Sequence, residues 1–239
     1  MSTEARLITV GGVKVEVVRK AIKNLHLGVY PPDGRVRVAA PLKYGDEAVR
    51  LAVVTRMSWI KRQAAKFEGQ ARQSARRYVS GETHYFLGHA YRLRLVELVG
   101  PGRVKRKSPR SIDLFVQPGS DLKQRESVYL RWCRAELRER AAPLIDKWSK
   151  AIGVTPSAWG IRRMKTKWGS CCIDAKRVWL NLELIKKPPH CLEYVIVHEL
   201  THFRERHHSA RFVAQMDKHM PRWRLVREEL NREPLLADS

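Results

Sequence analysis

The stretch YVIVHELTH, residues 194–202, decides how this chain builds its site. If the stretch is helical, His198 and His202 lie four positions apart on one helix face, where both imidazoles can bind a single metal ion. Glu199 follows the first histidine, and a carboxylate there can take a proton from water held by that ion. This H-E-x-x-H spacing is typical of zinc hydrolases, so we expect an enzyme that uses Zn2+.

A catalytic zinc ion needs a third protein ligand, and the sequence offers two kinds of candidate. The pair His207 and His208 follows the motif, and the step to His208 has the metzincin spacing H-E-x-x-H-x-x-G-x-x-H. Glu205 replaces the metzincin glycine, which allows a sharp turn, so metzincin geometry is disfavoured. A carboxylate from a later helix, Glu228 or Glu229, is the alternative third ligand.

The motif helix is expected to begin near His190 and to end near Arg206. Ser209 has the side chain of a helix N-cap, so a further helix is predicted from there through His219. A histidine placed directly before that cap would face the metal.

The N-terminal half is expected to be rich in β-strands. Four segments alternate apolar and polar residues as strands do, namely 13–17, 35–38, 91–95 and 112–116. Between them, Asp46 begins one long predicted helix that runs to about Arg77. These elements predict an N-terminal β-rich domain with one long helix over residues 1–118.

A linker at residues 118–120 separates this half from a predicted second domain over residues 119–239. Asp121 begins another long helix, which Pro143 is expected to kink or divide. Strand signals follow on both sides of a turn, at 161–165 and 178–182. Strands beside helices, without regular alternation, indicate the α+β fold class.

Composition indicates a soluble cytoplasmic protein. The 239 residues include 44% hydrophobic ones, but no segment approaches the roughly 20 apolar residues of a membrane span, and no secretory leader is expected. Four cysteines without C-x-x-C spacing are expected to be buried, reduced thiols rather than disulfides or metal ligands. The oligomeric state is left open.

The net charge of +23 favours polyanions, so nucleic acid is a candidate partner through a basic surface. The predicted hairpin tip at residues 103–110 is the best local candidate for phosphate contacts. A solvated basic surface without a partner explains the same charge equally well.

Several motifs are specific enough to suggest a family. They are WGSC (168–171), LELI (182–185), PP (188–189), YVIVHELTH (194–202), HSARF (208–212) and PRW (221–223), with PDGRVRV (32–38) and WI (59–60) in the N-terminal half. Together they resemble the YgjP-like metallopeptidase family, also called DUF45, which is related to the SprT-like zincins. The resemblance extends over nearly the whole chain.

The resemblance implies a minimal zincin-like domain, with the active-site helix beside a small antiparallel sheet. It implies that His198, His202 and His208 are the zinc ligands and that Glu199 is the general base, and it favours His208 over His207. Zinc lowers the pKa of a bound water to about 7, and Glu199 would accept the proton. The expected substrate is a protein or peptide, with intracellular proteins near nucleic acid as one possibility.

The same resemblance implies a substrate cleft beside the motif helix. In zincins an edge strand pairs with an extended peptide, and residues Val178 to Leu184 are the expected strand. Trp168 and Ser170 are candidates to line the cleft, although a purely structural role is favoured for both.

Two other functions stay open. The activated water would also cleave a phosphoanhydride in a nucleoside triphosphate, which nearby basic residues favour: Arg162, Arg163, Lys165 and Lys167. The third possibility is a nucleic-acid-binding protein with a structural zinc ion, which would use four protein ligands, with His207 as the candidate fourth.

Overall fold

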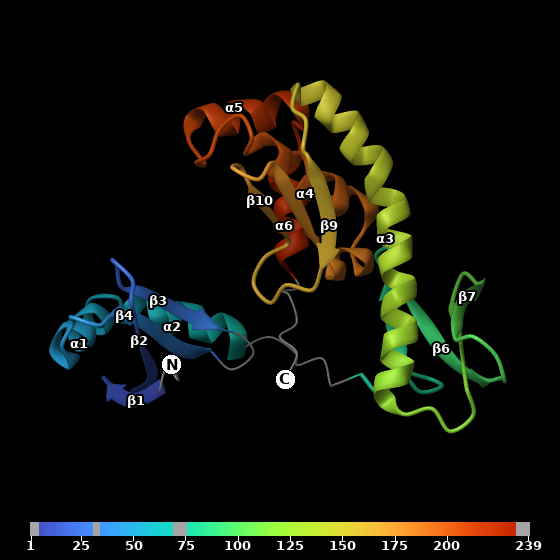
Figure 1. Ribbon diagram of the computed structural model, residues 1–239, viewed down its shortest axis with the longest axis horizontal. Helices are drawn as coiled ribbons and strands as arrows, with labels where there is room; N and C mark the ends of the chain where they lie inside the picture. The colour runs from blue at the N-terminus through green and yellow to red at the C-terminus, as the bar shows by residue number, and fades with distance from the viewer. Residues whose placement is uncertain (1–4, 31–33, 69–75, 233–239) are drawn as a thin grey trace. The chain divides into compact units, whose positions relative to one another are not determined.

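The computed structural model describes residues 5–30, 34–68 and 76–232. The chain forms two compact units, Met1–Ser74 with Leu236–Ser239, and Ala75–Leu235, and each is described here by itself. Six α-helices and three small sheets in the described residues confirm the expected α+β class (Figure 1). No helix in those segments combines the length and apolar composition that a bilayer span requires.

The first unit is a four-stranded sheet with two helices. Its strands are β1 (Ala5–Val10), β2 (Val13–Lys20), β3 (His26–Tyr30) and β4 (Arg35–Pro41), in the order β1-β2-β4-β3. Strands β2 and β4 are parallel, and the other two pairs are antiparallel. The predicted alternation puts Val15, Val17, Val36 and Val38 into the core. Residues 31–33, which overlap the PDGRVRV motif, lie outside the described residues.

The single helix predicted from Asp46 is two helices, α1 (Asp46–Thr55) and α2 (Met57–Glu68). The break falls at Arg56, directly after the β-branched run 53–55, whose restricted side chains weaken a helix. Val49 and Val53 are still buried, as the helical spacing predicted. The predicted C-terminal part of this helix falls mostly on residues 69–75, which are not described.

The second unit begins with another four-stranded sheet. Its strands are β5 (Thr83–Phe86), β6 (His89–Glu97), β7 (Arg103–Ser108) and β8 (Ser111–Val116), in the order β5-β6-β8-β7. The long helix α3 (Leu122–Ile152) follows, with a capping box at Asp121 and a left-handed Gly153 at its C-cap. Pro143 lies inside α3 but does not divide it.

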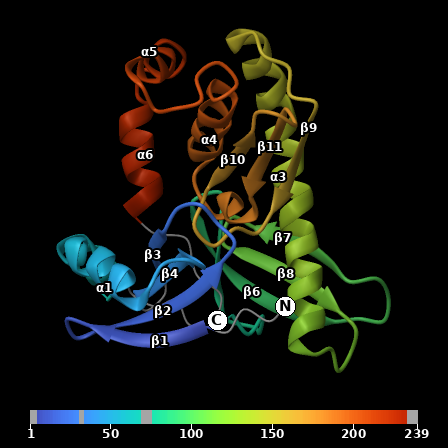
Figure 2. The ribbon, with the colours of Figure 1, turned by 60° about the vertical axis from the view of Figure 1, so that its left-hand side comes forward.

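A three-stranded sheet and three helices complete the second unit. The strands are β9 (Ala158–Arg162), β10 (Gly169–Cys172) and β11 (Arg177–Asn181), in the order β10-β11-β9. After a 3-10 turn (Leu182–Lys186) come α4 (Pro189–Thr201), α5 (Ala210–His219) and α6 (Trp223–Arg232). The predicted antiparallel sheet is mixed, because β9 and β11 run parallel (Figure 2).

The boundary predicted at residue 118 does not coincide with this division, because the β5–β8 sheet shares its core with the helices that follow. The Phe86 and Trp132 rings stack with centroids 4.8 Å apart. Two backbone hydrogen bonds, from Leu87 N to Ile185 O (2.8 Å) and from Gly88 N to Lys186 O (3.1 Å), tie β5 and its turn to the 3-10 turn. The sheet therefore belongs with the motif helix and not with the first unit.

Candidate metal centre

Helix α4 places the two histidines of the motif side by side. Its opposite face carries Val197, Leu200 and Thr201, which are fully buried and fix the helix in the core. His198 and His202 project from the remaining face, and their ring centroids are 4.9 Å apart. The helical spacing read from the sequence therefore produces the expected pair.

His208 approaches this pair from the segment between two helices. Helix α4 ends at Thr201, and α5 begins after Ser209, whose hydroxyl accepts a hydrogen bond from Phe212 N at 3.3 Å. This N-cap directs the preceding His208 back to the motif, so that its Nε2 lies 3.1 Å from Nε2 of His198.

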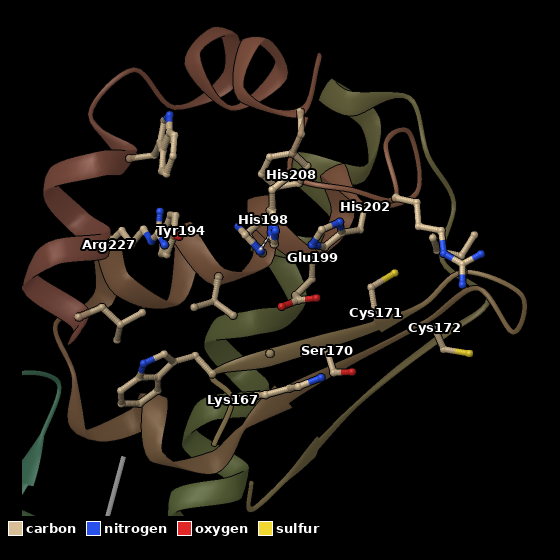
Figure 3. A pocket seen from close by; sticks show the side chains of 18 of the residues that line it. Lys167, Ser170, Cys171, Cys172, Tyr194, His198, Glu199, His202, His208 and Arg227 are labelled. Carbon is tan, nitrogen blue, oxygen red and sulfur yellow. Dashed lines mark hydrogen bonds between the residues drawn. The ribbon is translucent and has the colours of Figure 1, made fainter. Parts of the chain in front are cut away.

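The three histidines form a group whose potential ligand atoms all lie within 4.8 Å of one another (Figure 3). Neither His207 nor Glu228 belongs to this group. The other candidate third ligand, Glu229, lies instead in a group with His190 and Cys191, where it pairs with His190 at 2.6 Å. The described geometry thus brings together the three predicted ligands and none of their alternatives.

The electrostatics of the group suit a cation. Burial lowers the pKa of His198 to about 3, and the neighbouring His202 and His208 act in the same direction. Burial also lowers the pKa of His202. Imidazoles bind metals in the neutral form, so the ring nitrogens are available at neutral pH.

Two further contacts bear on whether these side chains fit a metal. Nδ1 of His202 lies 3.2 Å from the carbonyl oxygen of Glu205, so an N–H there leaves Nε2 with a free lone pair. The Nε2 atoms of His198 and His208 are close enough together for both to bind one cation when neither carries a proton. The three imidazoles therefore fit a zinc ion with an open coordination position.

Glu199 is a buried carboxyl group beside the histidines. Only 7% of its surface is exposed, and it faces β10 at Gly169, where a Cβ atom would lie 2.6 Å from its Oε1. Burial raises the pKa of Glu199 to about 7, although Lys167 and a hydrogen bond from the Cys171 backbone act in the opposite direction. A carboxyl group with this pKa exchanges protons near neutral pH.

Histidines and glutamate open into one cavity of about 820 Å³. Trp168 and Ser170 line it, as the sequence suggested, together with Cys171 from the same strand. The cysteines differ from the prediction: all four are free, but Cys171 is only half-buried and Cys172 is exposed. Neither belongs to a group of potential metal ligands in the described residues.

A protein-family model described as "YgjP-like, metallopeptidase domain" matches residues 23–233. The chain belongs to the YgjP-like family. The match includes strands of the first unit as well as the whole metal centre. A comparison with curated protein sequences finds no match.

Among solved structures, the YgjP-like chain is similar to the crystal structure of the metallopeptidase zymogen of Pyrococcus abyssi abylysin. The TM-score is 0.36 and the sequence identity is 18%, over 38% of this chain and 90% of that one.

The segment that we expected to be an edge strand of the YgjP-like domain is not at the edge of its sheet. Strand β11, which begins the predicted stretch Val178 to Leu184, lies in the middle of its sheet and pairs with β10 on one side and β9 on the other. Residues 182–186 are a 3-10 turn. The edge strand is β10, and it lines the cavity. Alternation of residues identified the strands but not their order in the sheet.

The sequence analysis did not predict that residues of α6 line one side of the cavity. This helix lines the cavity with Trp223, Arg227, Leu230 and Asn231, and Asn231 accepts a hydrogen bond from Nε1 of Trp168 at 3.3 Å. Tyr194, which lies one helical turn before His198, stacks on Trp223 with parallel rings and centroids 6.4 Å apart. Its spacing from His198 was the one signal in the sequence that pointed to this side of the site.

Proposed function

We propose that this YgjP-like domain is a zinc-dependent metallopeptidase in which His198, His202 and His208 hold the ion. Zinc in such a site supplies a Lewis acid that polarises a carbonyl group and acidifies water. The observation that carries the proposal is the buried Glu199 carboxyl group beside three clustered imidazoles, in a cavity large enough for a peptide segment.

Glu199 is the proton carrier of the proposed reaction. It takes the proton of the attacking water as general base and delivers it to the departing amine as general acid. In the metal-free protein burial raises its pKa to about 7, which brings the group closer to the pH of the reaction than an exposed glutamate would be. Burial excludes competing water from the carboxyl group and so strengthens its electrostatic interactions with the reacting atoms.

The substrate backbone is held by the edge strand β10. This strand pairs with β11 on one side only, and the cavity lies along it. An extended peptide adding to this edge would gain main-chain hydrogen bonds beside Glu199. Such recognition needs an unfolded or extended segment, so denatured proteins and flexible tails are the expected substrates.

The phosphohydrolase alternative has weaker support. Of the four basic residues that favoured it, only Lys167 lines the cavity. Arg163 pairs with Glu126 at 3.2 Å, and Arg162 lies over the Trp179 ring at 4.9 Å from its centre. A structural zinc site would need a fourth ligand, and the candidate His207 is exposed and outside the histidine group.

A separate proposal concerns the partner suggested by charge. The basic strand β7 exposes Lys105, Arg106 and Lys107, which supports binding to a polyanion such as nucleic acid. An enzyme bound to nucleic acid in this way would be close to substrate proteins that bind the same nucleic acid.

Substitution of Glu199 by glutamine tests the proposed chemistry. The zinc-loaded Glu199→Gln protein should retain its metal, measured by elemental analysis, and lose roughly 100-fold or more of its hydrolysis of denatured proteins and peptides. Glu193→Gln is the matched control, because this carboxylate lies on the same helix and pairs with Lys147 away from the cavity. Unchanged turnover in Glu199→Gln, or Glu199-dependent hydrolysis of nucleoside triphosphates alone, would contradict the proposal.

A further inference from the structure

Two basic side chains line the cavity from different elements. Lys167 precedes the edge strand, and its ammonium group points toward the Ser170 side of the cavity, away from Arg227 on α6 (Figure 3). Arg227 is therefore the basic group on the α6 side of the cavity.

The carboxylates on and beside α6 are already paired with other groups. Glu228 lies 3.8 Å from Arg232, Glu229 pairs with His190 at 2.6 Å, and Asp217 pairs with Arg224. Within residues 5–30, 34–68 and 76–232, no carboxylate forms an ion pair with Arg227 or Lys167. Two cations thus face the cavity with no ion-pair partner from the described chain.

The α6 side of the cavity is held in place by aromatic stacking and hydrogen bonds. Trp223 stacks on Tyr194, and its Nε1 donates to Asp217 at 2.8 Å. Leu230 is buried behind them, and Nε1 of Trp168 donates to Asn231 at 3.3 Å, which links the strand side of the cavity to α6. Arg227 itself is exposed, so water partly screens its attraction for an anion, and the fixed walls help to orient that anion.

The direction of β10 determines which substrate residues would lie near the α6 side of the cavity. The strand runs from Gly169 to Cys172. A peptide added antiparallel would run the other way, so the residues after the scissile bond would lie toward Gly169, Trp168 and the α6 wall. Residues before the scissile bond would lie toward Cys172.

We propose that Arg227 forms a subsite for a carboxylate group on the substrate residues that follow the scissile bond. The proposal rests on the proposed peptidase function. The guanidinium group of Arg227 can donate two parallel hydrogen bonds to a carboxylate. Either the C-terminal α-carboxylate or a Glu or Asp side chain supplies this chemistry.

Binding of uncleaved peptides tests the subsite. The probe is a peptide that the wild-type protein cuts, made with Glu or Gln directly after the cut bond, and with a free or an amidated C-terminus. Affinities are measured by calorimetry with zinc-loaded Glu199→Gln protein, in which the peptide stays intact. Loss of the recognised carboxylate should weaken binding by about tenfold or more, as expected for charge-assisted hydrogen bonds. The Glu/Gln pair and the acid/amide pair tell the two sources apart.

The same peptides are then measured with Arg227→Gln added, which should remove the preference, whereas Arg227→Lys should keep part of it. Arg232→Gln is the matched control, because it removes one charge from the same helix outside the cavity. The subsite proposal is wrong if the Arg227→Gln variant still prefers peptides with the carboxylate, or if the Glu199→Gln protein binds all the peptides equally well. Neither result contradicts the peptidase proposal. If no denatured protein or peptide is cut, both proposals fail, even if Arg227→Gln weakens binding of nucleoside triphosphates.

Discussion

Gly169 and Glu199 occupy complementary space at the junction of β10 and α4. A Cβ atom on Gly169 would stand 2.6 Å from Oε1 and 2.7 Å from Cγ of Glu199, well inside van der Waals contact. The glycine has no left-handed backbone, so it is needed for the space that it leaves and not for its flexibility. The WGSC motif and the H-E-x-x-H motif are therefore two halves of one packing arrangement.

Gly169→Ala is accordingly expected to displace the Glu199 carboxyl group. Misplacement of a catalytic group by about 1 Å can cost roughly 100-fold in rate, and overpacking should destabilise the fold by about 1–3 kcal/mol. Peptidase turnover and chemical denaturation measure the two effects, with zinc content expected to stay unchanged. Gly45→Ala, where a Cβ meets no atom within 4 Å, is the control. Full activity in Gly169→Ala would show that Glu199 tolerates the displacement.

The two adjacent histidines after α4 should differ in zinc affinity. His208→Ala removes a member of the histidine group and should weaken zinc binding by more than the roughly 10- to 100-fold typical of substitutions behind the ligands. His207→Ala should leave affinity nearly unchanged, because His207 is exposed and outside the group. Competition with a chromogenic chelator measures both. The reverse order of effects would reassign the third ligand.

Acid is expected to destabilise the β5–β8 sheet through a buried histidine. His84 is 3% exposed, and its Nε2 lies 2.9 Å from Oε2 of Glu82. Burial lowers the pKa of His84 below 6.5, and the hydrogen bond to Glu82 only partly offsets this. The folded state therefore favours neutral His84, and below about pH 6.5 the unfolded state takes up the proton first. Stability from this group is complete above that pH and is lost as the pH falls.

Thermal unfolding between pH 5 and 8 tests this linkage in metal-free protein. Tm should fall more steeply on acidification in the wild type than in His84→Gln, which cannot titrate. His89→Gln, an exposed histidine on the next strand, should follow the wild-type curve. Parallel curves for the wild type and His84→Gln would contradict the assignment.

Binding of duplex DNA should depend on salt through the exposed strand β7 and its turn. Replacing Lys105, Lys107 and Arg110 by glutamine should reduce the slope of log affinity against log salt by about 0.9 for each phosphate that the variant no longer neutralises. Fluorescence anisotropy at several salt concentrations gives the slope.

The control for this measurement removes the same charge from the first unit. Arg50, Lys61 and Arg62 are exposed on its helices, and their replacement lowers the net charge equally. If both triple variants reduce the slope by the same amount, DNA responds to total charge and β7 is not a binding surface.

The metal-binding part of the site could be predicted from the sequence because its geometry is local. His198, Glu199 and His202 lie within two helical turns, so the helix period fixes their relations. The Ser209 cap likewise fixes the approach of His208, one residue earlier. Such short-range rules need no knowledge of the rest of the fold.

The parts that could not be predicted depend on contacts between distant segments. The strand signals at 178–182 identified a strand but not its central place in the sheet, because strand order is set by partners far along the chain. Arg227 is one of many arginines in the sequence, and only the packing of α6 against α4 brings it to the cavity. The division of the chain into two units could not be predicted for the same reason, because it depends on the contact between Phe86 and Trp132, which are distant in sequence.

That shared core decides how the peptidase can be dissected. A fragment starting at residue 119 would leave Trp132 without its stacking partner and the 3-10 turn without its hydrogen bonds from Leu87 and Gly88. The smallest fragment that folds with an intact histidine group should therefore begin close to residue 76 and include the β5–β8 sheet. In this YgjP-like chain the β5–β8 sheet shares one hydrophobic core with the motif helix α4, so an exchange of the first unit for another domain has to leave this sheet in place.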